Sequence, residues 1–424
     1  MTAMRKQMIG MVLAGGRVDE LLVLTATRPK SAVPVWGMYR VIDFVLSNLM
    51  YAGIEVVGVL SQYRPYSLIT HLANGEPWDY VGRARALRIL SPFKGADDSD
   101  WYKGTADALY QNLGFIERYS PELVLVVAGD HVYSMDYRPM IRQHLATRAD
   151  LTIAFKRVPR DQAHRYGTAV LDEARRVVTY QEKVKHPAGD LASLTIYVFN
   201  TQVLVDRLRQ NAEEGRTFHV YSEIIPRMVE EQAKVFGWVF DGYWQYARTL
   251  DDYYATNMDI LGASAPDLAA WPVRTNLAPG SMGDHPPALF QRGAGARASL
   301  VCDGSALDGI VERSIISPGV TIERGAVVRD SVILHECRVE AGAILDRVIL
   351  DKRVRVGRGA HVGEGDTVSN ARHPDVLSCG VTVVGQESAI PAGMRIGRGC
   401  VISPGLREAD FAAAAVPSGA TVLP

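Results

Sequence analysis

The chain has 424 residues, too many for one ordinary hydrophobic core, so we expect at least two domains. Its 47 acidic and 46 basic residues nearly cancel, which gives no basic surface for nucleic acid and no acidic tail. No apolar run is long enough to cross a bilayer, and the apolar start leads into a glycine turn rather than a signal-peptide cleavage site. Cys302, Cys337, Cys379 and Cys400 lack metal-ligand spacing, which predicts free thiols in a reduced, cytoplasmic protein.

The first predicted element is a buried strand over residues 8–13, which ends in Ala14, Gly15 and Gly16. Glycines directly after a strand let backbone N–H groups approach an anion, and nearby cations offset its charge. The basic residues that follow are Arg17, Arg28, Lys30 and Arg40. A Gly-Gly turn alone is a weak signal, and solvated surface charge is the plainer reading of the basic residues.

Strands and helices alternate as far as about residue 260. Apolar runs over residues 54–60 and 123–128 suit central parallel strands, and helical patterns cover residues 106–119 and 138–146. This alternation predicts a Rossmann-like α/β domain with a mostly parallel sheet and a ligand crevice at the carboxyl ends of its strands. His71, taken alone, is expected to be a packed or surface histidine.

Five further motifs accompany the glycine turn. They are W-Y-K-G-T-A-D-A from Trp101, A-G-D-H-V-Y from Ala128, E-K at Glu182, A-S-L-T-I-Y-V-F from Ala192 and G-Y-W-Q-Y-A-R-T-L-D from Gly242. With the opening L-A-G-G-R, R-P-K-S-A-V-P and Y-R-V-I-D-F, this set resembles the bacterial glucose-1-phosphate adenylyltransferases (ADP-glucose pyrophosphorylases). The resemblance implies a nucleotidyltransferase of glycogen synthesis that joins ATP and glucose 1-phosphate into ADP-glucose and pyrophosphate, with Mg²⁺ as its metal.

The resemblance also implies roles for individual residues. Those for nucleotide binding are Leu13, Ala14, Gly15, Gly16, Gly104, Thr105 and Ala106, and those for the sugar phosphate are Tyr102, Gly167, Glu182, Lys183 and Ser193. Arg17 and Lys30 take catalytic roles, Asp130 is a metal ligand, and Arg28 and Arg40 are candidates for binding an effector. A helix cap for Thr105 and a turn residue at Asp130 are the structural alternatives.

The chain departs from the family pattern in the triphosphate loop. Val18, Asp19 and Glu20 stand where the family has Gly-Thr-Arg, so Glu20 replaces the loop arginine. At 4 Å and an effective dielectric constant near 20, a unit charge pair interacts by on the order of 4 kcal/mol. Two carboxylates facing a triphosphate are therefore expected to repel it.

Four further departures fall in the same predicted site. Tyr246 aligns with the second metal aspartate and Arg248 with a glycine, while Ser134 replaces a basic residue. A phenol with a pKa of about 10 is neutral and does not replace an anionic metal ligand. Thr195 replaces a glycine of the sugar pocket, where a β-branched side chain takes up space.

The last third of the chain carries a six-residue repeat after a linker rich in Pro, Gly and Ser. Aliphatic residues predicted to face inward are Ile310, Ile316, Ile322, Val328 and Leu334, then Ile344, Leu350, Val356 and Val362, then Val384, Ile390, Ile396 and Ile402. This spacing predicts a left-handed parallel β-helix. The expected boundaries are residues 1–270 for the nucleotidyltransferase-like domain, 271–290 for the linker and 291–424 for the β-helix.

Such a β-helix also occurs in acyltransferases, where a histidine acts as the base. His335, His361 and His373 are the candidates, but none stands in an acyl-transfer motif, and a lone histidine is more often structural. The segment D-R-V-I-L-D-K-R-V-R-V-G resembles the adenylyltransferase β-helix, which implies subunit contacts and regulatory sites.

These observations lead to one leading hypothesis and two alternatives. We predict a catalytically impaired, regulatory member of the family that binds nucleotide or sugar phosphate and assembles as a homo- or hetero-tetramer with an active paralogue. The first alternative is a working adenylyltransferase that uses Asp130 and a shifted ligand such as Asp241. The second is a homo-oligomeric sensor of sugar nucleotides.

Overall fold

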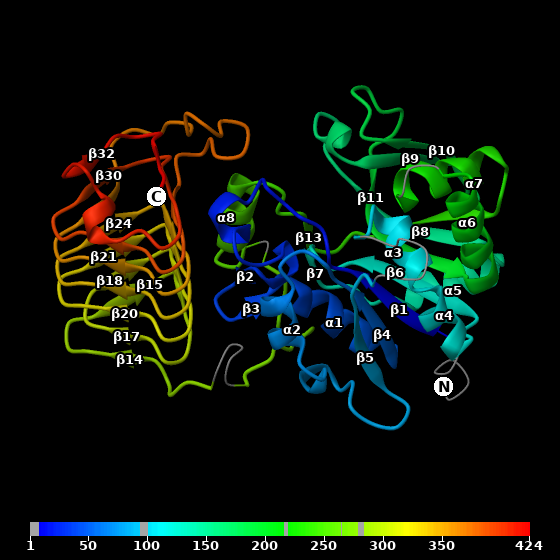
Figure 1. Cartoon of the computed structure of the whole chain (residues 1–424), viewed down its shortest axis with the longest axis horizontal. Helices are drawn as coiled ribbons and strands as arrows, with labels where there is room; N and C mark the ends of the chain where they lie inside the picture. Colours follow the sequence, from blue (N-terminus) through cyan, green and yellow to red (C-terminus); the bar gives the residue numbers. More distant parts are fainter. Residues whose placement is uncertain (1–7, 94–100, 216–218, 264, 279–283) are drawn as a thin grey trace. The chain divides into compact units, whose positions relative to one another are not determined.

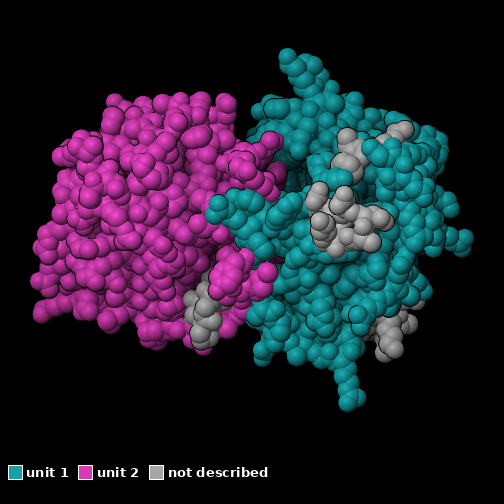
Figure 2. All heavy atoms as spheres, viewed as in Figure 1, with its two compact units in different colours: residues 1–16, 44–65, 72–244 teal, residues 17–43, 66–71, 245–424 magenta. Residues whose placement is uncertain are grey.

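The computed structural model describes residues 8–93, 101–215, 219–263, 265–278 and 284–424 (Figure 1). Residues 1–7, and residues 279–283 of the predicted linker, lie outside this description. The chain divides into two compact units, coloured separately in Figure 2. The first unit contains residues 1–16, 44–65 and 72–244, and the second contains residues 17–43, 66–71 and 245–424. The boundaries drawn from the sequence, at residues 270 and 290, remain a prediction.

Within the described residues, the first unit is organised around a nine-stranded sheet. Its path is β10-β9-β11-β6-β1-β4-β5, while β8 pairs with β11 and β12 pairs with β8. The bounds are Met8–Leu13 (β1), Val56–Leu60 (β4), Ala86–Leu90 (β5), Leu123–Ala128 (β6), Leu151–Arg157 (β8), Gly167–Leu171 (β9), Val177–Glu182 (β10), Leu191–Asn200 (β11) and Val235–Val239 (β12). Strands β6, β1, β4 and β5 run parallel, and β11 is antiparallel to β6 and β8.

Helices cover this sheet and bury its apolar side chains. Helix α5 packs on β8 and β12, and α6 packs on β6 and β11. The helix bounds along the chain are Val41–Ala52 (α1), Tyr66–Leu72 (α2), Thr105–Gln111 (α3), Leu113–Tyr119 (α4), Arg138–Thr147 (α5), Thr201–Glu213 (α6), Ile225–Glu230 (α7) and Leu250–Asp259 (α8). The predicted α/β architecture is confirmed, although the single helix expected over residues 106–119 is divided into α3 and α4. They part at Asn112, whose side-chain amide donates to the Ala108 carbonyl at 2.8 Å.

The remaining short strands of the N-terminal part are β2 (Pro34–Val35), β3 (Tyr39–Arg40), β7 (Val132–Tyr133) and β13 (Trp244–Gln245). Strands β2 and β3 form a hairpin in the second unit. Among the described residues, no helix has both the length and the apolar character needed to cross a membrane.

The C-terminal part of the second unit is a parallel β-helix, as predicted, and Figure 1 shows its coils stacked on one another. Its first sheet contains Leu289–Phe290 (β14), Ala306–Leu307 (β17), Thr321–Ile322 (β20), Arg338–Val339 (β23), Arg355–Val356 (β26) and Ala389–Ile390 (β29). The second contains Gly295–Arg297 (β15), Ile310–Glu312 (β18), Val327–Arg329 (β21), Ile344–Asp346 (β24), His361–Glu364 (β27), Arg395–Gly397 (β30) and Ala415–Val416 (β32). The third contains Leu300–Val301 (β16), Ile315–Ile316 (β19), Val332–Ile333 (β22), Val348–Leu350 (β25), Thr382–Val384 (β28), Val401–Ile402 (β31) and Thr421–Val422 (β33).

The inward positions of the early coils differ from the predicted ones. Ile310 is 39% exposed, whereas its neighbour Val311 is fully buried, and Leu345 rather than Ile344 lies in the core of the β-helix. The register pairs Val311 with Val328 and Val328 with Leu345, so these coils repeat after 17 residues rather than 18. One corner of each such coil is therefore one residue shorter. The inward-facing position consequently shifts by one residue from the position that strict six-residue spacing predicts.

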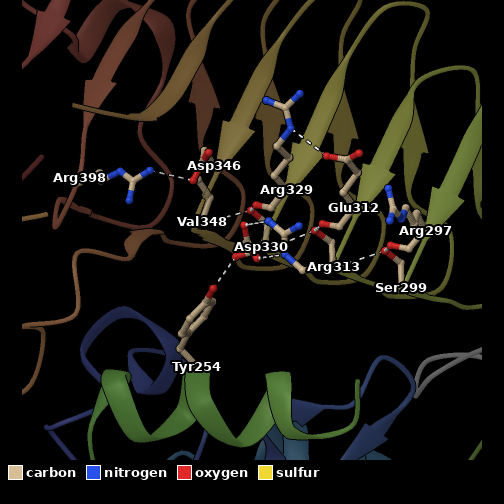
Figure 3. Close-up of polar contacts among 12 residues, drawn as sticks. Tyr254, Arg297, Ser299, Glu312, Arg313, Arg329, Asp330, Asp346, Val348 and Arg398 are labelled. Carbon is tan, nitrogen blue, oxygen red and sulfur yellow. Dashed lines mark hydrogen bonds and ion pairs between the residues drawn. The ribbon is translucent and has the colours of Figure 1, made fainter. Parts of the chain in front are cut away.

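Polar ladders hold the corners of these coils together (Figure 3). The Oγ of Ser299 accepts the backbone N–H of Ser314 at 3.1 Å, and the Oγ of Ser314 accepts that of Ser331 at 3.0 Å. Beside this ladder, Arg329 bonds Glu312 at 3.0 Å on the neighbouring coil. Because each side chain satisfies a group on the next coil, the ladder fixes the stacking register.

Helix α8 is attached to the same corner. The Tyr254 hydroxyl donates to the Asp330 carbonyl at 2.7 Å, as Figure 3 shows. At the start of α8, Thr249 and Asp252 form a capping box. Asp251 instead accepts hydrogen bonds from Ser378 and Cys379. These contacts within the second unit fix the start and the middle of the helix that follows residues 246–248.

Candidate functional site

The turn after β1 lies at the carboxyl end of the parallel sheet, in the first unit. The Ala14 N–H donates to the Leu60 carbonyl at 2.9 Å, and the Gly15 carbonyl accepts from the Tyr63 N–H at 3.2 Å. A Cβ atom on Gly15 would lie 2.9 Å from the Gln62 nitrogen, so only glycine fits there. A Cβ on Gly16 would meet nothing within 4 Å. Gly15 is thus required by packing, and Gly16 has open space beside it.

The Gly104–Ala106 turn is fixed by two sets of hydrogen bonds. The backbone N–H of Tyr102 donates to the Gln62 side chain at 2.7 Å, and the Gln62 amide donates back to the Tyr102 carbonyl at 3.2 Å. Gly104 is the N-cap of α3, and the Thr105 hydroxyl accepts the Val220 N–H at 3.0 Å. The alternative of Thr105 as a helix cap is therefore wrong, because its side chain bonds another segment.

Asp130 follows β6, and a hydrogen bond from the Gly129 N–H to the Leu13 carbonyl, at 2.9 Å, ties its turn to that of β1. His131 Nε2 lies 3.5 Å from an Asp130 carboxylate oxygen, and Trp244 Nε1 donates to His131 Nδ1 at 3.2 Å. The tryptophan thereby sets the tautomer of the histidine, whose Nε2–H faces Asp130. This relay orients the carboxylate that the resemblance assigns to the metal.

Few side chains in the described part of the chain suit a bound Mg²⁺. The described residues contain no group of three or more His, Cys, Asp or Glu side chains that could hold a metal ion. Asp241, the shifted ligand considered above, is exposed and lies beside Lys156, whose ammonium donates to the Gly242 carbonyl at 2.7 Å. Mg²⁺ prefers anionic oxygen ligands, and Tyr246 supplies a neutral phenol. The residues present do not fit the two-carboxylate site that the resemblance implies.

Four of the five predicted sugar-phosphate residues lie on or beside β9, β10 and β11 of the first unit: Gly167, Glu182, Lys183 and Ser193. The fifth, Tyr102, instead donates its hydroxyl to the Leu90 carbonyl at 3.1 Å. A Cβ on Gly167 would lie 2.4 Å from a Glu182 carboxylate oxygen and 2.5 Å from the Tyr180 hydroxyl, so both groups pack against its Cα. Lys183 Nζ lies 3.5 Å from the Glu182 carboxylate. Burial raises the pKa of Glu182, while Lys183 opposes that shift. The Glu182 carboxylate is thus shielded from water, and it only partly neutralises the charge of Lys183.

Several hydroxyl groups near this cluster are buried and lack a hydrogen-bond partner. They are those of Thr168, Ser193 and Tyr197. Buried polar groups without partners are uncommon in proteins, and in a pocket they indicate atoms that a ligand or water would satisfy.

Thr195 has a backbone conformation that glycine adopts far more easily. Its φ is 54°, in the left-handed region, where a β-branched residue is a clear outlier. The pairing of β11 with β8 changes register between Ser193 and Tyr197, so Thr195 lies in a bulge. The strain comes from a side chain placed where the family pattern has none.

In the second unit, the substituted loop is held by its own ion pairs. Arg17 bonds Asp19 at 2.7 Å. Both Nε and Nη2 of Arg248 lie 3.4 Å from one carboxylate oxygen of Glu20. The sequence predicted that the two carboxylates of this loop face and repel a triphosphate, whereas each of them has an arginine partner. Glu20 and Arg248 are both departures from the family pattern, and they pair with each other.

Lys30 and Tyr246 form a second contact of this kind. The Lys30 ammonium lies 3.8 Å from the centre of the Tyr246 ring, and Lys30 is only 2% exposed. At this distance and burial, a cation–π interaction is worth on the order of 2 kcal/mol. The residue that replaces the second metal aspartate therefore contacts the lysine predicted to be catalytic.

Arg28 and Arg40 are buried in the second unit, near basic residues of the β-helix. Arg28 forms an ion pair with Asp351, and Arg40 donates to the Ser67 carbonyl at 2.8 Å. The pKa of Lys352 falls well below its usual range, because burial and the charges of Arg40 and Arg28 disfavour its protonated form. His335 is buried, and neither of its ring nitrogens has a hydrogen-bond partner. We call Arg28, Arg40, His335 and the partly buried Lys352 the basic cluster.

The other histidines have structural surroundings. His71 is fully buried and its Nε2 lies 2.5 Å from Asp43, which confirms the expectation of a packed histidine. His361 lies 3.2 Å from Glu364, and the His373 carbonyl and N–H hold a turn with Leu377 and Asn370. This arrangement gives no support to an acyl-transfer base.

The sequence analysis did not identify three residues that contribute to these contacts. Arg248 was recognised only as a departure, although its charge opposite to that of Glu20 was a signal for pairing. Lys352 lies in the quoted segment D-R-V-I-L-D-K-R-V-R-V-G but was not assigned. His219, whose Nδ1 accepts the Thr105 N–H at 3.4 Å, carried no signal, because it comes from a distant segment.

Comparison with known proteins agrees with this architecture. A family model described as "Nucleotidyl transferase" matches residues 9–262, and one described as "GlmU-like, C-terminal hexapeptide" matches residues 286–384. The fold and these matches define a nucleotidyltransferase with a hexapeptide-repeat domain.

Curated relatives match almost the whole chain. A glucose-1-phosphate adenylyltransferase of Thermomicrobium roseum is 42% identical over 98% of this chain and 97% of its own. One of Thermotoga maritima is 40% identical over 98% of both chains, and one of Acetivibrio thermocellus is 34% identical over 99% and 98%. The chain belongs to the glucose-1-phosphate adenylyltransferase family.

Proposed function

We propose that this chain is a catalytically impaired member of the family that acts as a regulatory subunit beside an active paralogue. The observation that carries the proposal is the pairing of the substituted residues: Glu20 with Arg248, and Tyr246 with Lys30. Joining ATP and glucose 1-phosphate depends on positioning and on cations that stabilise developing charge. A lysine held against an aromatic ring and an arginine paired with a carboxylate are less available to stabilise the negative charge that develops during the reaction.

The proposed loss also concerns the metal and the sugar. Asp130 is one carboxylate where the family pattern has two, and Tyr246 does not supply the other. Thr195 adds a strained side chain to the predicted sugar pocket. Each change alone has a modest cost, and together they affect the triphosphate, the magnesium and the sugar.

The test is synthesis of ADP-glucose by the purified chain with ATP, glucose 1-phosphate and Mg²⁺. We expect no product above the rate of a matched Lys30→Ala variant. Turnover at a rate ordinary for the family would contradict the proposal and favour the first alternative, an active enzyme. The intact turn at Gly15 and the orientation of Asp130 by His131 and Trp244 are the observations that support that alternative.

The proposed regulatory role rests on the basic cluster. Asp351 balances Arg28, but His335 has no hydrogen-bond partner, and Lys352 lies among like charges. An anionic ligand such as a nucleotide or a sugar phosphate would give His335 a hydrogen-bond partner and would offset the positive charge around Lys352. Titration calorimetry with phosphorylated sugars and adenine nucleotides tests this role, with Lys352→Met as the variant expected to lose binding and the exposed Lys234→Met as the control.

The proposed partner is an active paralogue with an intact Gly-Gly-Arg-Gly-Thr-Arg loop. Co-expression of the two chains from one genome, followed by size-exclusion chromatography with light scattering, tests the assembly. A mixed tetramer whose activity responds to effectors differently from the paralogue alone supports a regulatory subunit. Separate homo-oligomers would contradict the subunit role and favour the sugar-nucleotide sensor.

A further inference from the structure

Residues 219–221 join two predicted binding motifs within the first unit. His219 Nδ1 accepts the backbone N–H of Thr105 at 3.4 Å, and the Val220 N–H donates to the Thr105 hydroxyl at 3.0 Å. The rings of His219 and Tyr221 stack with centres 4.9 Å apart and planes inclined by 25°. Lys183 Nζ lies 5.5 Å from the centre of the Tyr221 ring. One short segment thus contacts both the Gly104–Ala106 turn and Lys183.

The hydrogen bond from Thr105 fixes the tautomer of His219. An Nδ1 atom that accepts an N–H carries no proton, so in the neutral ring the proton is on Nε2. Burial, followed by the charge of Lys183, lowers the pKa of His219, while Glu223 opposes that shift. His219 is therefore a neutral imidazole whose Nε2–H is a hydrogen-bond donor near the lysine.

Lys183 is held in position by its backbone. Its φ is 47°, in the left-handed region, and its N–H donates to the Tyr166 carbonyl at 3.1 Å. A non-glycine residue in this conformation costs on the order of 1–3 kcal/mol, and such strain is concentrated at functional sites. Its acidic neighbour is Glu182, whose carboxylate is largely buried and has a raised pKa.

We propose that His219 is a second phosphate-recognition residue, which donates its Nε2–H to the same phosphate group that Lys183 attracts. The inference deepens the proposed binding of sugar phosphate at Lys183 and rests on it. A phosphate monoester has three terminal oxygens, so it accepts from an ammonium and from an imidazole N–H at once. Because Nδ1 holds Thr105, the same histidine connects the phosphate to the nucleotide-binding turn.

The test is titration calorimetry on the purified full chain with glucose 1-phosphate, inorganic phosphate and glucose. A hydrogen bond to a charged group contributes about 1.5–3 kcal/mol, so we expect His219→Ala to weaken glucose 1-phosphate binding by roughly tenfold or more. His219→Gln retains a donor near the Nε2 position and is expected to stay within about threefold of the wild type. His219→Asn, which retains only the acceptor near Nδ1, is expected to bind as weakly as His219→Ala.

Controls separate recognition from folding. Tyr221→Phe keeps the stacked ring, and His164→Ala removes an exposed histidine of the same unit; both are expected to bind as the wild type does. Equal binding by His219→Ala and the wild type overturns the inference, as does a loss confined to glucose. The impaired-enzyme proposal fails separately, if the wild type synthesises ADP-glucose. That result would leave the binding differences among the His219 variants unchanged.

Discussion

Glu20 and Arg248 form an ion pair in which both Nε and Nη2 of the arginine lie 3.4 Å from one carboxylate oxygen. The family pattern has an arginine at the first position and a glycine at the second, so both partners are substitutions. A carboxylate introduced alone into a loop shaped for a triphosphate would be exposed to repulsion, but here it has a partner. The Glu20 carboxylate therefore has its counter-ion within the protein.

Charge reversal tests this pair. Glu20→Arg places two guanidinium groups together, and Arg248→Glu places two carboxylates together, so we expect each to lower the free energy of unfolding. Both side chains are more than a third exposed, so each loss is at most about 1 kcal/mol. The double variant restores an attractive pair and is expected to recover most of the loss. Urea unfolding measures the cycle, and additive losses would show that the pair does not interact.

Tyr246 is expected to stabilise the buried ammonium of Lys30. Tyr246→Leu removes the aromatic face and should lower the unfolding free energy by about 1–2 kcal/mol more than Tyr246→Phe, which keeps it. The same comparison in a Lys30→Met background should show no such difference, because the cation is gone. If the difference between Leu and Phe persists in that background, the cation–π contact is not its cause.

Thr195→Gly is expected to stabilise the protein. Glycine adopts a φ of 54° without steric cost, so the unfolding free energy should rise by about 1 kcal/mol. Thr195→Ala keeps a Cβ, so it removes the crowding but retains most of the strain and serves as the matched control. Equal stability of the two variants would mean that the backbone is not strained at this position.

His144 gives the first unit an acid-sensitive group. Its Nδ1 lies 2.9 Å from the Thr152 hydroxyl, and burial lowers its pKa to about 4, against an opposing effect of Asp150. Since the folded-state pKa lies below the unfolded value of 6.5, the neutral form contributes its stability above pH 6.5. That stability is lost as the pH falls from 6.5 through 4, by up to about 3 kcal/mol.

Chemical denaturation at pH 7.5 and pH 4.5 measures this effect. The wild type should lose more stability between the two values than His144→Gln, which has no titrating group. Exposed His164→Ala should lose as much as the wild type. An identical pH slope for His144→Gln and the wild type would show that His144 is not the group responsible.

The sequence predicted the fold well where local pattern decides it. The strand over residues 8–13 and the β-helix follow from apolar periodicity and are confirmed. The inward phase at Ile310 and Ile344 could not be derived, because a shortened corner is set by stacking between coils. Thr195 was recognised as a bulky residue in place of glycine, but its left-handed backbone depends on a bulge between two strands.

The substituted residues show the same limit. Their identities at positions 20, 246 and 248 were readable from the motifs, whereas their partners were not, because pairs such as Glu20 and Arg248 are far apart in the chain. The sequence therefore predicted repulsion in the loop, and the structure has paired charges. Tertiary contacts changed the physical reason for the proposed impairment but not its location.

The most direct measurement compares ADP-glucose synthesis by the wild type with that of a variant combining Glu20→Arg, Thr195→Gly, Tyr246→Asp and Arg248→Gly. These changes remove the internal pairs, supply the second carboxylate and open the predicted sugar pocket. The account predicts no product from the wild type and Mg²⁺-dependent product from the combined variant. Rapid synthesis by the wild type would contradict it.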